Sequence, residues 1–381
     1  MAYFDNAATT YPKPDCVYEY MDSFYRTGGV NVGRGNYKLT QSAGALVEDT
    51  RKKIQELLHC QAKQVVFEPT ATIALNIIIQ GIIEKGAVNI YISPFEHNAV
   101  TRTLHHFEEQ GRIKVHQLTV SKAMVYDLER IRYQFDKEKP DFVIVSHASN
   151  VFGLIAPVEE IFALAKRYDA VTLVDMAQTA GLIDLNVGLS TIDFAVFAGH
   201  KTLFGPTGIS GFVMNSAMKF PVVIFGGTGF ESANQDMPEE LPQKYEMGTL
   251  NIAGIAGLNA ALGWLAQITV EAIKEREVEN RRRLIRTLSK YSFIKIIGNY
   301  DTCSYVGIVS CIIDGISSDS AGSVFDRCGI AVRTGLQCAP LAHQFMGTFP
   351  AGTIRFSVSY FTKDVDFSEL EKALEYIDSE I

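Results

Sequence analysis

The chain has 381 residues, of which 47% are hydrophobic and 20% are charged, and its formal net charge is −8. This length exceeds what a single hydrophobic core usually serves, so we expect a large and a small domain. The negative charge argues against a nucleic-acid or membrane-surface role, because both require a concentrated basic face, and it leaves a small molecule as the expected partner. No apolar run reaches the roughly 18 residues of a membrane span and no signal peptide is evident, so a cytoplasmic location is expected. The six cysteines are scattered without Cys-x-x-Cys spacing, so neither disulfides nor a zinc site is expected.

Short β-branched runs alternate with helical patterns between residues 65 and 215. This alternation predicts an α/β fold with a mostly parallel sheet flanked by helices. The runs 142–146 and 171–175 are apolar at consecutive positions, which is typical of strands covered on both faces. In chain order, the expected strands and helices lie at 65–68, 70–85, 88–93, 97–111, 114–120, 142–149, 158–170 and 171–177.

The second half of the chain predicts a smaller α+β domain. Residues 250–291 read as helix, first apolar and then charged, which could lead from the large domain to the small one. We expect residues 15–260 to form the large domain, and residues 1–14 with 261–381 to form the small one. The polar segment 226–244 is expected to be a long loop of functional importance. The expected strands and helices of the small domain lie at 293–298, 306–314, 320–328, 330–335 and 353–361, followed by an acidic C-terminal helix.

Two charged side chains in apolar surroundings are the first candidates for chemistry. Lys201 is the only Lys, Arg, Asp or Glu between residues 194 and 212, and a desolvated lysine has the lowered pKa that a Schiff-base nucleophile needs. The alternative is an ordinary solvated lysine. Asp175 follows a buried strand at the sheet edge where α/β proteins bind ligands, and it could face a protonated pyridine nitrogen. The alternative for Asp175 is a helix N-cap.

Two helix starts are expected at the same edge of the sheet. His97 would open the helix after strand 88–93, where its imidazole could stack on a flat ring or simply cap the helix. Segment 69–76 offers free backbone N–H groups, including that of Ala71, together with the Thr72 hydroxyl. Such a helix start suits a phosphate, although every helix start has these groups.

Two further candidates lie in the small domain. Cys338 follows a glycine turn and is five residues from Arg333, an exposed setting beside a cation such as reactive cysteines require. The other five cysteines lie in helical or strand-like runs and are expected to be packing residues. Arg355 is a single cation in an apolar strand, where it could bind a carboxylate bidentately or form a structural salt bridge.

An ordered set of motifs covers nearly the whole chain. One such motif would mean little, whereas the full series in order resembles the class V aminotransferase family and, within it, the cysteine desulfurases and selenocysteine lyases. The matching motifs are FDNAATT (4–10), NVGRG (31–35), HNAV (97–100), SHASNVFG (146–153), DMAQ (175–178), GHK (199–201), YEMGT (245–249), VRTGLQCAP (332–340) and IRFSVSYF (354–361).

The resemblance implies a fold-type I homodimer with pyridoxal 5′-phosphate as its cofactor. Lys201 would hold the cofactor as a Schiff base and remove the Cα proton of an amino-acid substrate, and Cys338 would take up sulfur as a persulfide and pass it to a protein acceptor. The other implied contacts are His97 stacked on the ring, Asp175 at the pyridine nitrogen, Gln178 at the phenolic oxygen, and Ala71, Thr72, His200 and the partner subunit's Thr249 around the phosphate. The substrate carboxylate would be bound by Arg355 and Asn150, with Arg333 near the reactive loop.

Three positions depart from the family pattern. Ala198 stands where many relatives carry a serine or threonine, so one phosphate hydrogen bond must come from elsewhere. Ile73 replaces a frequent glutamate, and Gln337 replaces a histidine that often precedes the cysteine.

The expected activity is conversion of L-cysteine to L-alanine. A selenocysteine lyase would use the same residues, and another class V transaminase or lyase would leave Cys338 incidental. A non-catalytic scaffold is the remaining alternative, and the intact set of Lys201, Asp175 and Cys338 argues against it, because site residues rather than fold determine function.

Overall fold

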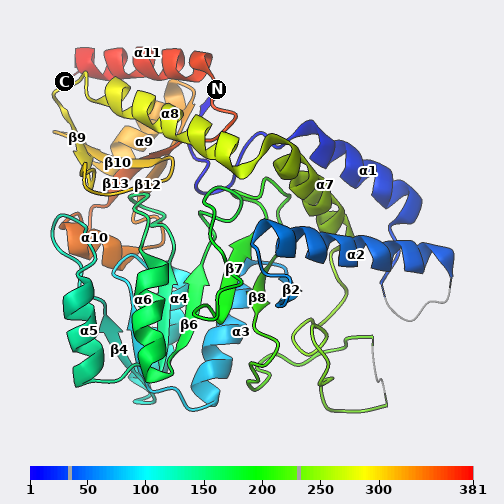
Figure 1. Cartoon of the computed structure of the whole chain (residues 1–381). Coiled ribbons are helices and arrows are strands. Elements are labelled where there is room, and N and C mark those ends of the chain that lie inside the picture. Colours follow the sequence, from blue (N-terminus) through cyan, green and yellow to red (C-terminus); the bar gives the residue numbers. More distant parts are fainter. Residues whose placement is uncertain (33–36, 230–232, 381) are drawn as a thin grey trace.

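A seven-stranded sheet forms the centre of the larger part of the molecule (Figure 1). The structure is a computed structural model that describes residues 1–32, 37–229 and 233–380; positions 33–35 of the NVGRG motif and positions 230–232 of the polar loop lie outside the described residues. Strand β8 runs antiparallel to both of its neighbours and the remaining adjacent pairs are parallel, which confirms the predicted α/β sheet. The strand order is β2 (Gln64–Glu68), β8 (Ser210–Met214), β7 (Phe194–Ala198), β6 (Val171–Asp175), β5 (Phe142–Ser146), β3 (Asn89–Ile92) and β4 (Lys114–Gln117).

Both faces of this sheet are covered, which explains the consecutive apolar residues of its strands. In β6, Val174 packs into a core cluster on one face and Leu173 into a second cluster on the other. Each such side chain contributes roughly 1.5–3 kcal/mol when fully buried. The helices of this part are α1 (Asp15–Gly28), α2 (Lys38–Leu57), α3 (Ala71–Glu84), α4 (Asn98–Glu109), α5 (Leu128–Lys137), α6 (Val158–Ala165) and α7 (Ile252–Ile268), with a short 3-10 turn at Lys166–Tyr168.

The smaller part is built on a four-stranded antiparallel sheet with its own buried cluster. Both chain ends lie here (Figure 1), because β1 (Ala2–Tyr3) pairs in parallel with β11 (Ile330–Ala331). The N-terminal segment therefore lies against the C-terminal third of the chain. The sheet order is β12 (Arg333–Gly335), β13 (Thr353–Ser357), β10 (Ile308–Ile313) and β9 (Ile294–Ile297), and the helices are α8 (Val270–Leu288), α9 (Ser318–Arg327), α10 (Pro340–Met346) and α11 (Asp364–Glu380).

Residues 250–291 are mostly helical, as predicted, but they form two helices and not one. Helices α7 and α8 meet at Thr269, where the chain bends by 83°. The residues Ile268, Thr269 and Val270 are all β-branched, which lowers helix propensity at this point. Thr269 then begins the next helix as its N-cap, because its side chain accepts a hydrogen bond from the Ala272 N–H.

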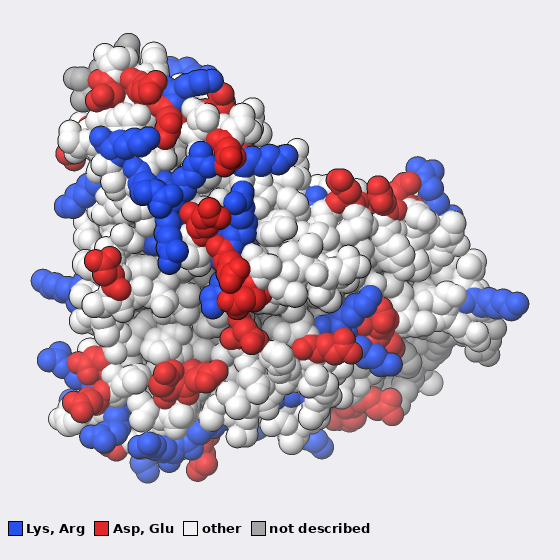
Figure 2. Space-filling view, turned by 45° about the horizontal axis from the view of Figure 1, so that its top comes forward, with Lys and Arg blue, Asp and Glu red and all other residues white. Residues whose placement is uncertain are grey.

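The surface of the described chain gives two simple results. None of the described helices is by itself both long and apolar enough to cross a bilayer; α7 and α8 meet that test only as a pair, and the apolar residues of α7 are largely buried inside the protein. On the face shown in Figure 2, acidic and basic side chains are interspersed. That face therefore does not present a field of a single sign.

Candidate active site

Eight of the predicted site residues line one cavity of about 290 Å³ at the carboxyl edge of the parallel strands. Asp175 ends β6, His97 follows β3, and Lys201 lies three residues after β7. The ends of neighbouring parallel strands meet at one edge, so residues far apart in sequence converge there. The eight are Ala71, Thr72, His97, Asn150, Asp175, Gln178, His200 and Lys201.

Lys201 and Asp175 form the electrostatic centre of this cavity. Burial lowers the pKa of Lys201 to about 8, and the Asp175 charge opposes that shift. Burial raises the pKa of Asp175, while a hydrogen bond from the Ala177 N–H at 2.9 Å and the Lys201 charge oppose the rise. Asp175 does not cap an α-helix, because the chain continues from β6 in turns up to β7.

His97 caps a helix and also lines the cavity. It is the N-cap of α4, and its Nδ1 accepts a hydrogen bond from the Ala99 N–H at 3.0 Å. Burial, reinforced by the Lys201 charge, lowers the pKa of His97 to about 4. The ring is therefore neutral at physiological pH with its proton on Nε2, and it lines the cavity as a flat, uncharged surface.

The first turn of α3 and His200 also line the cavity. The Thr70 side chain caps α3 by accepting from the Ile73 N–H, which leaves Ala71 and Thr72 at the cavity wall. The Nδ1 atom of His200 is buried and has no hydrogen-bond partner among the described residues. Such an orphaned polar atom is costly unless a ligand completes its hydrogen bonding.

Residues in and just after the N-terminal FDNAATT motif donate hydrogen bonds to the main chain at His200 and Lys201. The His200 carbonyl accepts hydrogen bonds from the Thr9 hydroxyl at 3.0 Å, the Thr10 N–H at 3.2 Å and the Lys13 ammonium at 2.5 Å. The Thr10 hydroxyl donates to the Lys201 carbonyl at 2.9 Å. Burial lowers the pKa of Lys13 to about 8. The sequence reasoning missed Lys13, whose only signal is its position between two prolines just after the motif.

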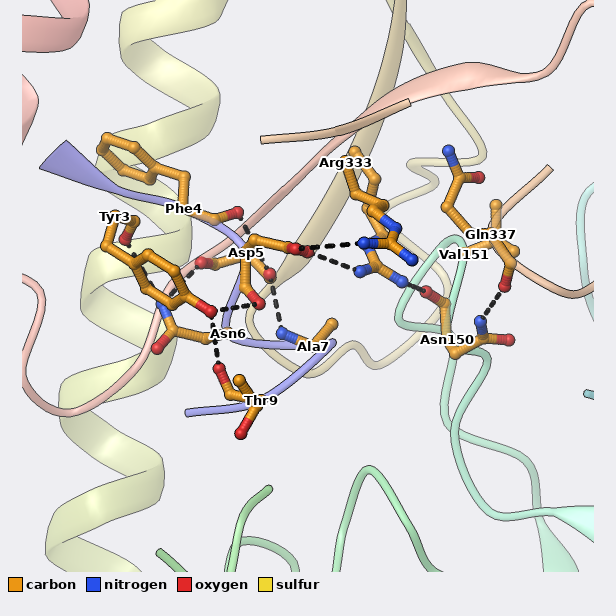
Figure 3. A network of polar contacts seen from close by, with 12 residues as sticks. Tyr3, Phe4, Asp5, Asn6, Ala7, Thr9, Asn150, Val151, Arg333 and Gln337 are labelled. Carbon is orange, nitrogen blue, oxygen red and sulfur yellow. Dashed lines mark hydrogen bonds and ion pairs between the residues drawn. The ribbon is translucent and has the colours of Figure 1, made fainter. Parts of the chain in front are cut away.

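Arg355 forms the salt bridge that was considered as an alternative to carboxylate binding. One Arg355 Nη donates to Asp5 at 2.8 Å and the other to the Asn150 carbonyl at 2.8 Å. Figure 3 shows Asp5, Asn150 and Arg333 in this part of the molecule. The Nε of Arg355 is buried without a partner among the described residues, so the guanidinium still has a free donor. Arg333 is largely exposed, and its Nη1 lies 3.9 Å from an Asp5 oxygen. Neither arginine lines the cavity: Arg355 contacts the cavity residue Asn150, whereas Arg333 lies near Asp5.

Cys338 lies at an adjoining cavity of about 510 Å³, which it shares with Thr72 and His97. Its side chain is exposed, and its carbonyl accepts a hydrogen bond from the Asn98 N–H of α4 at 2.7 Å. Cys338 therefore lies next to the Lys201 cavity. Thr249 is exposed and does not line that cavity.

Two buried residues that the sequence reasoning missed lie outside the cavity and contact residues at the site. Glu96 accepts hydrogen bonds from Ser93 and from the backbone and hydroxyl of Ser146, and burial raises its pKa to about 7. His343 of α10 contacts Gln337, the residue before Cys338, at 2.9 Å. Glu96 could have been noticed as the neighbour of His97, whereas nothing in the sequence connects position 343 with position 337.

Comparison with known proteins places the chain in a family. The family model described as aminotransferase class V matches residues 2–370. A probable cysteine desulfurase of Methanothermobacter thermautotrophicus is 30% identical, covering 98% of this chain and 94% of the relative, and one of Halalkalibacterium halodurans is 31% identical, covering 98% and 92%. The solved structure of a cysteine desulfurase from Thermococcus onnurineus NA1 is similar over 100% of this chain and 95% of that one, with a TM-score of 0.90 and 26% identity. The chain therefore belongs to the class V aminotransferases, as its motifs predicted.

Proposed function

We propose that the protein is a pyridoxal-phosphate-dependent cysteine desulfurase, which converts L-cysteine to L-alanine and takes up the sulfur on Cys338 as a persulfide. The observation that carries this proposal is the position of Cys338, beside His97 and next to the cavity in which Lys201 lies near Asp175. The names of the relatives support it, because they are probable cysteine desulfurases over nearly the whole chain.

The residues of the cavity fit pyridoxal phosphate. The volume of about 290 Å³ is close to that of the smallest small-ligand sites, about 300 Å³. The start of α3 and the orphaned Nδ1 of His200 suit a phosphate, and His200 offers the contact that Ala198 cannot make. Asp175 suits the pyridine nitrogen, because a buried carboxylate is stabilised by a facing cation. When bound, the cofactor supplies an electron sink for the electron pair left at the substrate Cα.

The chain's own residues would bind the substrate and move its proton. The free Nε of Arg355 and the amide of Asn150 would hold the substrate carboxylate. The Lys201 amine, whose lowered pKa leaves part of it neutral near pH 7, would take the Cα proton. His97 stays neutral and would cover the face of the cofactor ring without adding charge.

The sulfur-transfer step balances without an outside oxidant. The Cys338 sulfur, having lost its proton, attacks the substrate sulfur; an S–S bond forms and the substrate Cβ–S bond breaks, with its electron pair remaining on Cβ. Carbon is reduced and the two sulfurs are oxidised. The one proton that Cβ gains matches the one that Cys338 loses, so the products are L-alanine and the Cys338 persulfide.

The proposal extends to the assembly and location of the enzyme. It includes a homodimer in which Thr249 of the partner subunit contacts the cofactor phosphate, a protein that accepts the persulfide sulfur, and a cytoplasmic location. The support for the homodimer is that Thr249 is exposed and outside the cavity of its own chain.

The test is alanine release from L-cysteine, measured beside L-selenocysteine. We expect Cys338→Ala to abolish alanine and persulfide formation from L-cysteine, whereas Cys328→Ala, a partly exposed cysteine at the end of α9, keeps wild-type turnover. Turnover of L-cysteine by Cys338→Ala at the wild-type rate would reject the proposal in favour of another class V reaction. Turnover of L-selenocysteine alone would identify a selenocysteine lyase.

A further inference from the structure

The residue before Cys338 is held at both its side chain and its main chain. The Gln337 side-chain amide donates to the Thr353 carbonyl at 2.9 Å, and its side-chain oxygen lies 2.9 Å from His343 Nε2. The Gln337 main-chain carbonyl accepts a hydrogen bond from Asn150 Nδ2 at 2.6 Å. Three elements distant in sequence, the loop after β5, helix α10 and strand β13, therefore converge on one residue.

The protonation of His343 fits this arrangement. Burial lowers the pKa of His343 to about 4, so the ring is neutral and carries one proton. The Gln337 side-chain oxygen can only accept, so that proton lies on Nε2, and Nδ1 accepts from the Thr348 hydroxyl at 2.8 Å. Each hydrogen bond in the chain from the partly buried Thr348 through the buried His343 to the buried Gln337 thus has a donor and an acceptor.

This anchoring is needed because the backbone at the site is unfavourable. Gln337 has a φ of 40° and Cys338 a φ of 58°, two successive non-glycine residues in the left-handed region. Such conformations persist only where surrounding contacts hold them. The 337–338 peptide, which sets the direction of the Cys338 side chain, would relax if its anchors were removed.

Asn150 donates a hydrogen bond to the 337–338 peptide and also lines the cavity. It lines the Lys201 cavity, and Figure 3 shows its amide directed at Gln337. Its main-chain carbonyl accepts a hydrogen bond from Arg355. Its Nδ2 has two hydrogens, and only the one given to Gln337 is in a hydrogen bond within the described part of the chain. The second can reach a ligand in the cavity without releasing Gln337.

We propose that Asn150 is a positioning residue for Cys338: one hydrogen of its amide fixes the 337–338 peptide and the other serves the substrate carboxylate, so that one side chain sets the separation of thiol and substrate. Gln337, oriented by His343, is the second anchor. This inference rests on the proposed function for the use made of Cys338, but the anchoring itself is tested without turnover.

The experiment measures amide hydrogen exchange of residues 336–340 in the cofactor-loaded protein by mass spectrometry. Asn150→Ala and Gln337→Ala should each speed exchange there about three- to tenfold, the effect of one net hydrogen bond. Asn150→Asp is the decisive variant, because it keeps the shape and removes the donor. A space-filling role predicts wild-type exchange in Asn150→Asp, whereas a donor role predicts exchange as fast as in Asn150→Ala.

Two further readouts separate positioning from general damage. Gln344→Ala, an exposed position on α10 beside His343, should leave the exchange of 336–340 unchanged, and exchange in β5 and β6 should be unchanged in every variant. In single-turnover experiments with L-cysteine, Asn150→Asp and Gln337→Ala should slow persulfide formation on Cys338, while the visible absorbance of the bound cofactor is unaltered.

The outcomes decide the inference either way. Wild-type exchange in Asn150→Asp would overturn it, and so would faster exchange accompanied by an unchanged rate of persulfide formation. If the wild-type protein released no alanine from L-cysteine, the proposed function would fail, and the exchange rates alone would still decide whether Asn150 anchors Cys338.

Discussion

The Lys201 amine acts as a nucleophile only in its neutral form. Burial lowers its pKa to about 8 against the opposing Asp175 charge, so about a tenth of it is neutral at pH 7. Because the neutral fraction rises as pH increases through the pKa, capture of pyridoxal phosphate by the cofactor-free protein should speed up between about pH 6.5 and 8.5 and level off above about pH 9. Stopped-flow absorbance of the bound cofactor checks this.

Two controls test whether the pH midpoint of cofactor capture reflects the lowered pKa of Lys201. N-acetyl-lysine methylamide, which has an ordinary lysine pKa near 10.4, should continue to accelerate up to about pH 10. Asp175→Asn removes the charge that favours the ammonium form, so the midpoint should move to lower pH. A wild-type midpoint near pH 10 would contradict the desolvation of Lys201.

At the level of single residues, the sequence could predict those whose own surroundings are unusual. Lys201 and Asp175 stand out because each is a charge in an apolar segment, and the structure places both in one cavity. Asp5 and Arg355, by contrast, are separated by 350 positions. Which residue forms the ion pair with such a charged side chain depends on tertiary contacts, and local sequence does not encode these contacts.

At the level of elements, periodicity predicted the sheet and most helices, but it failed at Thr269. This residue has a φ of 76° and a ψ of 143°, a region that strongly favours glycine. Thr269→Gly should relieve that strain and lose only part of the N-cap, raising the free energy of unfolding by roughly 1 kcal/mol. Urea denaturation of the cofactor-loaded protein measures this difference.

The N-cap of α9 provides the control for this prediction. Ser317 caps its helix in the same way but has an ordinary φ of −65°, so Ser317→Gly relieves no strain and should be neutral or slightly destabilising. A loss of stability in Thr269→Gly larger than that in Ser317→Gly would show that the cap, and not the backbone strain, dominates at the α7–α8 bend.

At the level of the whole molecule, a buried ion pair joins α2 to the YEMGT segment. Both terminal nitrogens of Arg51 bind the Glu246 carboxylate at 2.8 Å, and both side chains are less than 10% exposed. Nearby Glu68 is buried, and one of its oxygens has no hydrogen-bond partner among the residues that the structure describes. Burial, with the Glu246 charge, raises the pKa of Glu68 to about 8. Arg51→Met would leave the Glu246 charge uncompensated beside Glu68 and should cost about 3–5 kcal/mol of unfolding free energy.

Two variants test that explanation by urea denaturation. Arg51→Met with Glu246→Gln removes both charges and should recover part of the loss. Arg26→Met breaks the exposed pair with Asp22 and should change stability by less than about 1 kcal/mol. Equal effects of Arg51→Met and Arg26→Met would contradict a special role for the buried pair.

Assembly can be tested by mixing two chains with different defects in cofactor binding, because the proposed homodimer divides each site between two subunits. Lys201→Ala lacks the nucleophile and Thr249→Ala lacks the phosphate contact. If Thr249 serves the partner's cavity, a mixed dimer contains one site with neither defect, and random exchange gives such sites at about a quarter of the total. These sites should bind pyridoxal phosphate with wild-type affinity, detected by absorbance titration after subunit exchange. If Thr249 served its own chain instead, each site of the mixed dimer would carry one defect, and mixing would restore none.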